Sequence, residues 1–318
     1  MPASAIDHAF TARSNLGAAG DPTYAGALSF MRRRYTKNLK GADAVVWGIP
    51  FDAAVTNRPG ARFGPQAIRR AAAIFDNDPQ YPFARDLFAD LAVIDYGDCL
   101  LDNGNHQKTP ATIEREAKKL LKSGAFLLSL GGDHFVTWPL LKAHAARHGP
   151  LALVQFDAHQ DTWFDDGKRI DHGSFVGRAV RDGVIDPERS IQIGIRTHAP
   201  HDCGIRILYG HEVDEMRADE IAYQIAERTG GRKVYITFDI DCLDPAYAPG
   251  TGTPVAGGPS SAKMLSVLRQ LGQLDIVGAD IVEVSPPYDH ADITAIAGAT
   301  VAQHYLGLLA ERKAREHA

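Results

Sequence analysis

Cysteine is scarce in this sequence and is not arranged in pairs. Three cysteines occur in 318 residues, far apart in the chain: Cys99, Cys203 and Cys242. An odd number of widely spaced cysteines provides neither a disulfide framework nor a cysteine-rich zinc site. The composition therefore predicts a reduced protein, as is usual in the cytoplasm.

The sequence also lacks a long apolar run and an excess of charge of either sign. No stretch approaches the ~20 apolar residues that span a bilayer, and the first thirty residues contain no apolar segment typical of a signal peptide. The formal net charge of -5 does not favour a nucleic-acid partner. Hydrophobic residues, at 45%, are sufficient for a sizeable core. We therefore expect a soluble cytoplasmic protein with no nucleic-acid or membrane partner.

Short apolar runs alternate with helix-like segments along the chain. The runs are rich in β-branched residues and do not alternate with polar ones, which is typical of parallel strands covered on both faces. Strands are predicted at Ala44–Gly48, Ala92–Asp95, Ala125–Leu130, Leu151–Phe156, Ile191–Ile195, Ile205–Tyr209, Lys233–Phe238 and Ile276–Val282. Helices are predicted at Pro65–Ala73, Ile113–Ser123, Thr137–Arg147, Ala218–Arg228, Ser261–Leu271 and Ile293–Arg315. This order predicts an α/β fold with a parallel sheet.

No linker, repeat or low-complexity tract divides this pattern. We therefore predict a single domain over residues 41–318. Residues 1–40 show little periodicity and are predicted to form an N-terminal arm that packs on the body or on a neighbouring subunit.

Acidic and histidine residues follow three of the predicted strands. A lone Asp or His after a strand is usually a helix cap or a turn former. Here six such residues occur together, and the ends of parallel strands are where sites are built in open sheets. The six are His134, Asp157, His159, Asp161, Asp239 and Asp241.

Four carboxylates and two imidazoles are too many ligands for one ion and about right for two. Packing so many acidic groups together is costly unless a cation neutralises them. Oxygen donors outnumber nitrogen donors and no thiolate is present, which favours Mn²⁺ over a structural zinc ion. Iron, cobalt and zinc stay open as alternatives. Cys242 lies beside Asp241 but alternates to the other side, so we predict that it belongs to the core.

The motifs around these residues resemble those of the ureohydrolase (arginase/agmatinase) superfamily, and are most similar to its agmatinase branch. The similarity covers roughly residues 45–310. Its motifs are Arg58-Pro59-Gly60-Ala61-Arg62-Phe63-Gly64-Pro65, Gly131-Gly132-Asp133-His134, Asp157-Ala158-His159-Gln160-Asp161, Asp171-His172-Gly173, Phe238-Asp239-Ile240-Asp241-Cys242-Leu243-Asp244-Pro245, the loop 248–254 and Glu283-Val284. Phe135 and Gln160 depart from the family pattern. Neither is a predicted metal ligand, so these departures concern the shape of the pocket rather than metal binding.

The resemblance implies a three-layer αβα sandwich on a mostly parallel eight-stranded sheet, with residues 41–318 as a ureohydrolase-like catalytic domain. It also implies two Mn²⁺ ions per subunit and a homo-oligomer, a trimer or a hexamer. One ion would be held by His134, Asp157, Asp161 and Asp239, and the other by His159, Asp157, Asp239 and Asp241. Asp157 and Asp239 would then bridge the two ions.

A guanidinium group is a poor electrophile, so its hydrolysis needs a strong nucleophile, a carboxylate to orient the planar cation, and a proton for the leaving amine. Glu283 is predicted to orient the guanidinium as a bidentate partner, a role that the resemblance also implies. Asp161 and His172 are the two candidates for the proton step. We predict that Thr253 shapes the pocket and that Trp163 offers a cation–π face.

The similarity to the agmatinase branch favours agmatine as the substrate, which would be cleaved to putrescine and urea in polyamine biosynthesis. Asp165 or Asp166 could bind its terminal ammonium, whereas Lys168 and Arg169 could attract the carboxylate of a guanidino acid, such as 4-guanidinobutyrate or 3-guanidinopropionate. Arginase activity is a weaker alternative, because the segment 162–170 lacks the Ser/Asn-rich character of arginases. Two further alternatives are a mononuclear zinc deacylase and a non-catalytic homologue.

Overall fold

The computed structural model describes residues 7–75 and 79–316, and within them nine strands form one parallel sheet. The strand order is β1-β3-β2-β4-β9-β8-β5-β6-β7, and every neighbouring pair is parallel. The strands are β1 (Arg34–Tyr35), β2 (Ala44–Ile49), β3 (Val93–Asp98), β4 (Phe126–Gly131), β5 (Ala152–Phe156), β6 (Ile191–Ile195), β7 (Arg206–Tyr209), β8 (Lys233–Asp239) and β9 (Asp275–Val282).

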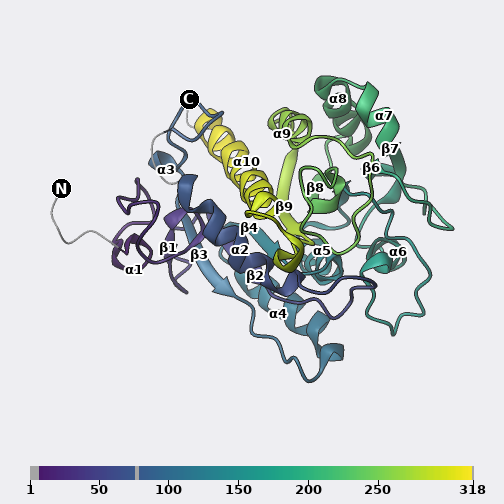
Figure 1. Ribbon diagram of the computed structural model, residues 1–318, viewed down its shortest axis with the longest axis horizontal. Coiled ribbons are helices and arrows are strands. Elements are labelled where there is room, and N and C mark those ends of the chain that lie inside the picture. The colour runs from purple at the N-terminus through teal and green to yellow at the C-terminus, as the bar shows by residue number, and fades with distance from the viewer. Residues whose placement is uncertain (1–6, 76–78, 317–318) are drawn as a thin grey trace.

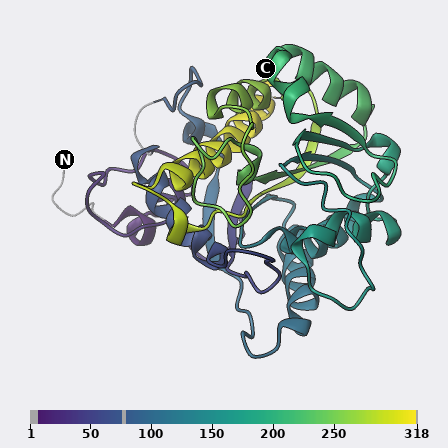
Figure 2. The same cartoon turned by 45° about the vertical axis from the view of Figure 1, so that its right-hand side comes forward.

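Helices cover both faces of this sheet, as Figures 1 and 2 show. Successive strand residues point to opposite faces, so that Leu127 and Leu128 belong to different hydrophobic clusters. One cluster is covered by α2 (Gly64–Ala71), α3 (Leu87–Asp90), α7 (Gly210–Glu215), α8 (Ala218–Thr229), α9 (Ser261–Arg269) and α10 (Ile293–Glu316). The other is covered by α4 (Thr109–Leu121), α5 (Thr137–His148) and α6 (Phe175–Arg181).

This arrangement confirms the predicted three-layer αβα fold, with nine strands in place of eight. All eight predicted strands are present, and the additional one, β1, is only two residues long and pairs with β3. Four short helices, α1 (His8–Thr11), α3, α6 and α7, were not predicted because four to seven residues are too few for a recognisable period.

The predicted N-terminal arm contributes to the body of the molecule. A short helix, α1 (His8–Thr11), and β1 lie within it, and Phe30 and Met31 are fully buried in the cluster under α2 and α10. Residues 1–6 of the arm lie outside the described residues. The division at residue 40 stays a prediction.

Helix α10 is the one described helix that is long and apolar enough to cross a membrane. However, 72% of its apolar window is buried inside the protein, where it packs along the sheet (Figure 1). Its composition is that of a core helix, because its partners are other elements of this chain.

Candidate metal centre

Four neighbouring strands bring the predicted site residues to one edge of the sheet. In the order β4-β9-β8-β5, His134 follows β4, Glu283 follows β9, Asp239 ends β8 and Asp157 follows β5. All four lie at the carboxyl ends of parallel strands, so residues up to 149 positions apart in sequence are hydrogen-bonded neighbours.

The acidic residues also shape the turns that follow the strands. Asp239 accepts a hydrogen bond from Asp241 N (2.8 Å), and Asp157 accepts one from His159 N (2.6 Å). These are the capping contacts expected of an Asp after a strand. The capping role and the predicted ligand role are therefore compatible, because each carboxylate has a second oxygen and further lone pairs.

A first cluster surrounds the Nδ1 atom of His134. Asp157 Oδ2 lies 3.0 Å from this nitrogen, and Asp161 Oδ2 and Asp239 Oδ2 each lie 3.1 Å from it. All four side chains are almost completely buried. Among the described residues this nitrogen has no hydrogen-bond partner of good geometry, and a single proton on it could bond to only one of the three oxygens. A multivalent cation satisfies all of them at once.

A second cluster shares Asp157 with the first. His159 Nδ1 lies 3.1 Å from Asp241 Oδ2 and 3.4 Å from Asp157 Oδ1. Asp157 thus presents one oxygen to each cluster. Thr253 Oγ1 donates to Asp241 Oδ2 (3.2 Å), which places this predicted pocket residue against the second cluster.

Burial makes the ionised carboxylates of these clusters unfavourable. It raises the pKa of Asp239 well above its usual value, and the carboxylates of Asp241 and Asp157 raise it further. Burial and the Asp157 carboxylate raise the pKa of Asp161 to about 6. Because divalent cations remove this repulsion, the oxygen-rich donor set fits two metal ions of the hard or borderline class.

A buried relay orients His134. Its Nε2 lies 2.8 Å from Thr237 Oγ1, and Thr237 in turn donates to Asp280 Oδ1. Thr137 and Tyr235 hydroxyls also donate to Asp280, each at 2.9 Å. Since the Thr237 hydrogen is directed to Asp280, its oxygen accepts from His134 Nε2–H, which leaves the Nδ1 lone pair facing the carboxylates. Asp280 and Thr237 were missed by sequence reasoning, although an Asp inside the apolar run of β9 is an unusual residue for a buried strand.

Glu283 lies beside the clusters with one oxygen free. Its Oε1 accepts from His134 N (2.8 Å) and lies 2.7 Å from His172 Nδ1. Among the described residues its Oε2 has no hydrogen-bond partner, although the side chain is 1% exposed. Glu283 (φ 62°) and Asp161 (φ 52°) are both in the left-handed region, a conformation that is costly for these residues and is concentrated at functional sites.

His172 forms part of the same network. Burial lowers its pKa, but the Glu283 carboxylate and its hydrogen bond outweigh burial, so the pKa rises to about 9. Thr56 Oγ1 lies 2.9 Å from its Nε2 atom.

A cavity of about 440 Å³ is lined by residues of both clusters, namely Asp161 and Asp239 of the first and His159 of the second. Its polar and aromatic walls include the predicted residues Trp163, His172 and Thr253, whereas His134 and Glu283 are not among its lining residues. The lining residues are Thr56, His159, Asp161, Trp163, Phe164, Arg169, Asp171, His172, Gly173, Asp239 and Thr253.

Among the residues considered for binding the substrate tail, the structure brings Trp163 and Arg169 to the cavity wall. Asp165 is 3% exposed and is paired with Arg178 and Arg181, so the expectation that it could bind an ammonium group is wrong. Asp166 and Lys168 do not line the cavity.

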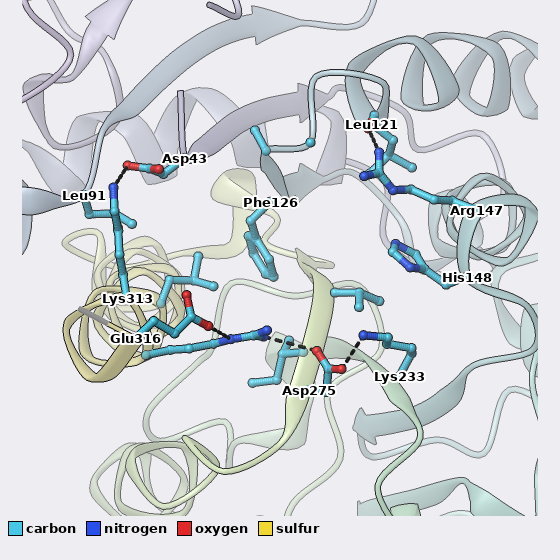
Figure 3. Close-up of a pocket in the computed structure, with 16 residues that line it drawn as sticks. Asp43, Leu91, Leu121, Phe126, Arg147, His148, Lys233, Asp275, Lys313 and Glu316 are labelled. Atoms are coloured by element: carbon cyan, nitrogen blue, oxygen red, sulfur yellow. Dashed lines mark hydrogen bonds and ion pairs between the residues drawn. The ribbon is translucent and has the colours of Figure 1, made fainter. Parts of the chain in front are cut away.

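A second cavity, of about 390 Å³, lies at the amino-terminal ends of the strands, opposite the carboxyl ends that carry the two clusters (Figure 3). Lys233 and Asp275, the first residues of β8 and β9, form an ion pair in its wall. Arg312 is paired with Asp275 and Lys313 with Asp43. Among the described residues, no group of His, Cys, Asp or Glu side chains that could hold a metal ion lies in the wall of this cavity.

Comparison with known proteins agrees with this geometry. The sequence profile of the arginase family matches residues 42–307. An agmatinase of Chromobacterium violaceum is 48% identical over 309 residues, which is 96% of each chain. The crystal structure of a hypothetical agmatinase from Burkholderia thailandensis is 50% identical, with a TM-score of 0.96 over 97% of this chain and 99% of that one.

A more distant solved relative is the proclavaminate amidino hydrolase of Streptomyces clavuligerus. It is 40% identical, with a TM-score of 0.85 over 92% of this chain and 100% of that one. The matched region includes the four strand ends that carry the clusters and Glu283. The chain therefore belongs to the arginase family and is a ureohydrolase, an enzyme that hydrolyses carbon–nitrogen bonds of guanidino groups.

Proposed function

We propose that the enzyme hydrolyses agmatine to putrescine and urea, with two Mn²⁺ ions held by His134, Asp157, His159, Asp161, Asp239 and Asp241. The similarity to agmatinases over almost the whole chain supports the substrate. The shared carboxylate of Asp157, with one oxygen in each cluster, supports a pair of ions.

The observation that carries the proposal is the free Oε2 atom of Glu283. A buried carboxylate oxygen without a donor is unfavourable, and a planar guanidinium supplies N–H donors of matching geometry. Only 3.4 Å would separate this oxygen from a β-carbon on Gly252, so a side chain there would crowd it. Glu283 therefore fixes the orientation of the guanidinium plane beside the clusters.

In the reaction, water adds to the guanidino carbon and the bond to the alkylamine nitrogen breaks, giving urea and an amine that gains a proton. Two ions held by the six ligand residues would supply a strong nucleophile from water at neutral pH. Glu283 holds the cation in place, and Trp163 packs against the chain that leaves. Asp161 and His172 both line the cavity, and either can deliver the proton to the departing nitrogen.

The test measures urea and putrescine released by the manganese-loaded protein. We expect the highest kcat/KM for agmatine among agmatine, 4-guanidinobutyrate, 3-guanidinopropionate and arginine. Asp157→Asn should remove both metal and turnover, whereas Glu283→Gln should keep the metal and lose turnover. A higher kcat/KM for any other compound of the series would overturn the agmatine assignment, and full activity of Asp157→Asn would refute the shared ligand.

A guanidino acid is the second candidate, and one observation favours it. Arg169 lines the cavity with a side chain that is 64% exposed, so its guanidinium could pair with a substrate carboxylate. The same substrate series separates the two candidates.

The number of metal ions per subunit distinguishes both candidate guanidino hydrolases from a zinc deacylase. We expect about two manganese ions per subunit, whereas one zinc ion would favour deacylation. A non-catalytic homologue should lack a ligand or Glu283, and this chain has all of them.

We also propose that the enzyme is a cytoplasmic homo-oligomer, a trimer or a hexamer. The family resemblance supports the homo-oligomer. The scarcity of cysteine supports the cytoplasmic location. Light scattering on the purified protein tests the assembly, and a monomeric mass would contradict it.

A further inference from the structure

The cavity must accommodate a second positive charge if the substrate is an aminoalkyl guanidine, a point that rests on the proposed function. We propose that Asp171 binds the terminal ammonium group of the substrate and thereby selects substrates with a cationic tail. Among the residues that the structure describes, three carboxylates line the cavity: Asp161, Asp171 and Asp239. Asp161 and Asp239 belong to the first metal cluster, so Asp171 is the one that remains for the tail.

The other acidic residues of the same segment are already engaged. Asp165 accepts hydrogen bonds from Arg178 Nε (2.7 Å) and from Arg181 (2.6 Å) and is buried. Asp166 accepts from the backbone nitrogens of Lys168 (2.8 Å) and Arg169 (2.9 Å), outside the cavity wall. Neither can reach a substrate without breaking these contacts.

Asp171 has capacity to bind a cation. Its Oδ1 accepts one hydrogen bond, from Gly173 N (3.0 Å), while its Oδ2 lies 3.7 Å from a terminal nitrogen of Arg169. A carboxylate offers about four lone pairs, so most of its acceptor capacity is free. The Arg169 pair is long and the Arg169 side chain is exposed, so an ammonium group can displace it at little cost.

Gly173 keeps the space between Asp171 and the metal centre open. A β-carbon on Gly173 would lie 3.5 Å from Asp171 Oδ1, 3.5 Å from Trp163 Cε3 and 4.0 Å from Asp161 Oδ1. The Asp171 carboxylate, the Trp163 ring and the metal-site carboxylate therefore surround one point that carries no side chain. A short alkyl chain that starts at Glu283 can pass this point along Trp163 and end at Asp171.

The charge test uses Asp171→Asn, because the amide oxygen can still accept from Gly173 N while the negative charge is lost. We expect KM for agmatine to rise about tenfold or more, since a hydrogen bond to a charged group is lost. The kcat/KM for 4-guanidinobutyrate, whose tail is anionic, should stay constant or rise. Asp166→Asn is the matched control, with the same charge change in the same segment, and should keep the wild-type ratio of the two substrates.

Two results would overturn the role of Asp171. An equal loss on both substrates would show that it only positions His172, and an unchanged KM for agmatine would show no contact with the tail. If the unmodified enzyme fails to turn over agmatine, the proposed function fails instead, and inhibition by putrescine then reports whether Asp171 binds an ammonium group.

A second variant, Gly173→Ala, tests the path of the substrate's alkyl chain past Trp163. This test does not require the fold to tolerate Asp171→Asn. Gly173→Ala adds a methyl group at ordinary contact distances, so the melting temperature should be unchanged. The methyl group narrows the space beside Trp163, and KM for agmatine should rise several-fold. A wild-type KM in this variant would exclude the path.

Discussion

At the residue scale, the metal centre depends on groups that do not belong to it. Asp280 is fully buried and receives hydrogen bonds from the hydroxyls of Thr137, Tyr235 and Thr237. Of these three hydroxyls, that of Thr237 links Asp280 to His134, because its oxygen accepts a hydrogen bond from the imidazole Nε2–H. The orientation of His134, a candidate metal ligand, is thus set by a carboxylate on the neighbouring strand.

Replacing Thr237 by valine should weaken metal binding while the fold is kept. Valine has the same shape but cannot accept from His134, and loss of such an outer partner typically lowers metal affinity about 10- to 100-fold. Manganese titration against a competing chelator measures the change. Thr237→Ser, which keeps the hydroxyl, should bind as the wild type does, and equal affinity in the valine variant would show that the relay is not needed.

His144 on α5 is a buried histidine that belongs to neither cluster of candidate metal ligands. Among the described residues neither of its ring nitrogens has a hydrogen-bond partner. Its ring lies 5.0 Å from that of Tyr235 and covers Gly278, where a β-carbon would lie 2.3 Å from the imidazole. Burial, together with the smaller effects of the nearby His148 and Arg147, lowers its pKa to about 3.

We therefore expect His144 to make the protein less stable at acidic pH. The ring is neutral when folded and binds a proton on unfolding, so stability falls as the pH drops below about 6.5. At about 1.4 kcal/mol per pH unit, lowering the pH from about 6.5 to about 5 should cost about 2 kcal/mol. Denaturant unfolding of His144→Leu should show a shallower decline, and the exposed-site variant His290→Leu should follow the wild type. Parallel curves for all three proteins would contradict this.

At the scale of elements, the site is formed at the carboxyl ends of the four strands β4, β9, β8 and β5. The sequence analysis found the ends of β4, β5 and β8 because each is a short apolar run followed by Asp or His. It could not show that β4 and β5 are separated by β9 and β8, because strand order depends on long-range pairing. It also missed β1, α1, α3, α6 and α7, which are short elements stabilised by packing rather than by a sequence pattern of their own.

The inability to predict long-range contacts from sequence also explains why Asp165, rather than Asp171, was considered for binding the substrate's ammonium group. Asp165 and Asp171 are both acidic residues of one irregular segment, and nothing local distinguishes them. The difference arises from α6, whose residues Arg178 and Arg181 pair with Asp165. Since α6 was not predicted, neither was its effect on the cavity.

Gly132 controls how the end of β4 meets the loop after β2. A β-carbon at this position would lie 1.7 Å from Phe51 O, a backbone atom that cannot move aside alone. Gly132→Ala should therefore destabilise the fold by about 3 kcal/mol and displace His134, with loss of metal. Denaturant unfolding and metal content measure both effects.

A glycine elsewhere near the site provides the control. At Gly177 in α6 the nearest atom to an added β-carbon is 3.7 Å away, so Gly177→Ala should be neutral or slightly stabilising. If Gly132→Ala unfolds at the same denaturant concentration as Gly177→Ala, the close contact with Phe51 is not a constraint.

At the scale of the whole molecule, the metal centre joins parts of the sheet that are far apart in sequence. His134 follows β4 on one side of β9 and β8, and Asp157 follows β5 on the other. With the proposed ligands, a metal ion would be bound only when all four strands are in register, so the unfolded chain would not compete for it. Metal binding should therefore stabilise the entire sheet, including the strands that carry no ligand.

The consequence is a melting temperature that depends on free manganese. At roughly a thousandfold excess over the dissociation constant, binding to the folded state alone adds about 4 kcal/mol. Calorimetry should give one transition that moves to lower temperature when a chelator removes the metal and returns when manganese is restored. Asp157→Asn, without the shared ligand, should melt at the same temperature with and without metal. If instead the wild-type transition splits, with one part insensitive to manganese, then the strands do not unfold together and the centre stabilises only its own edge of the sheet.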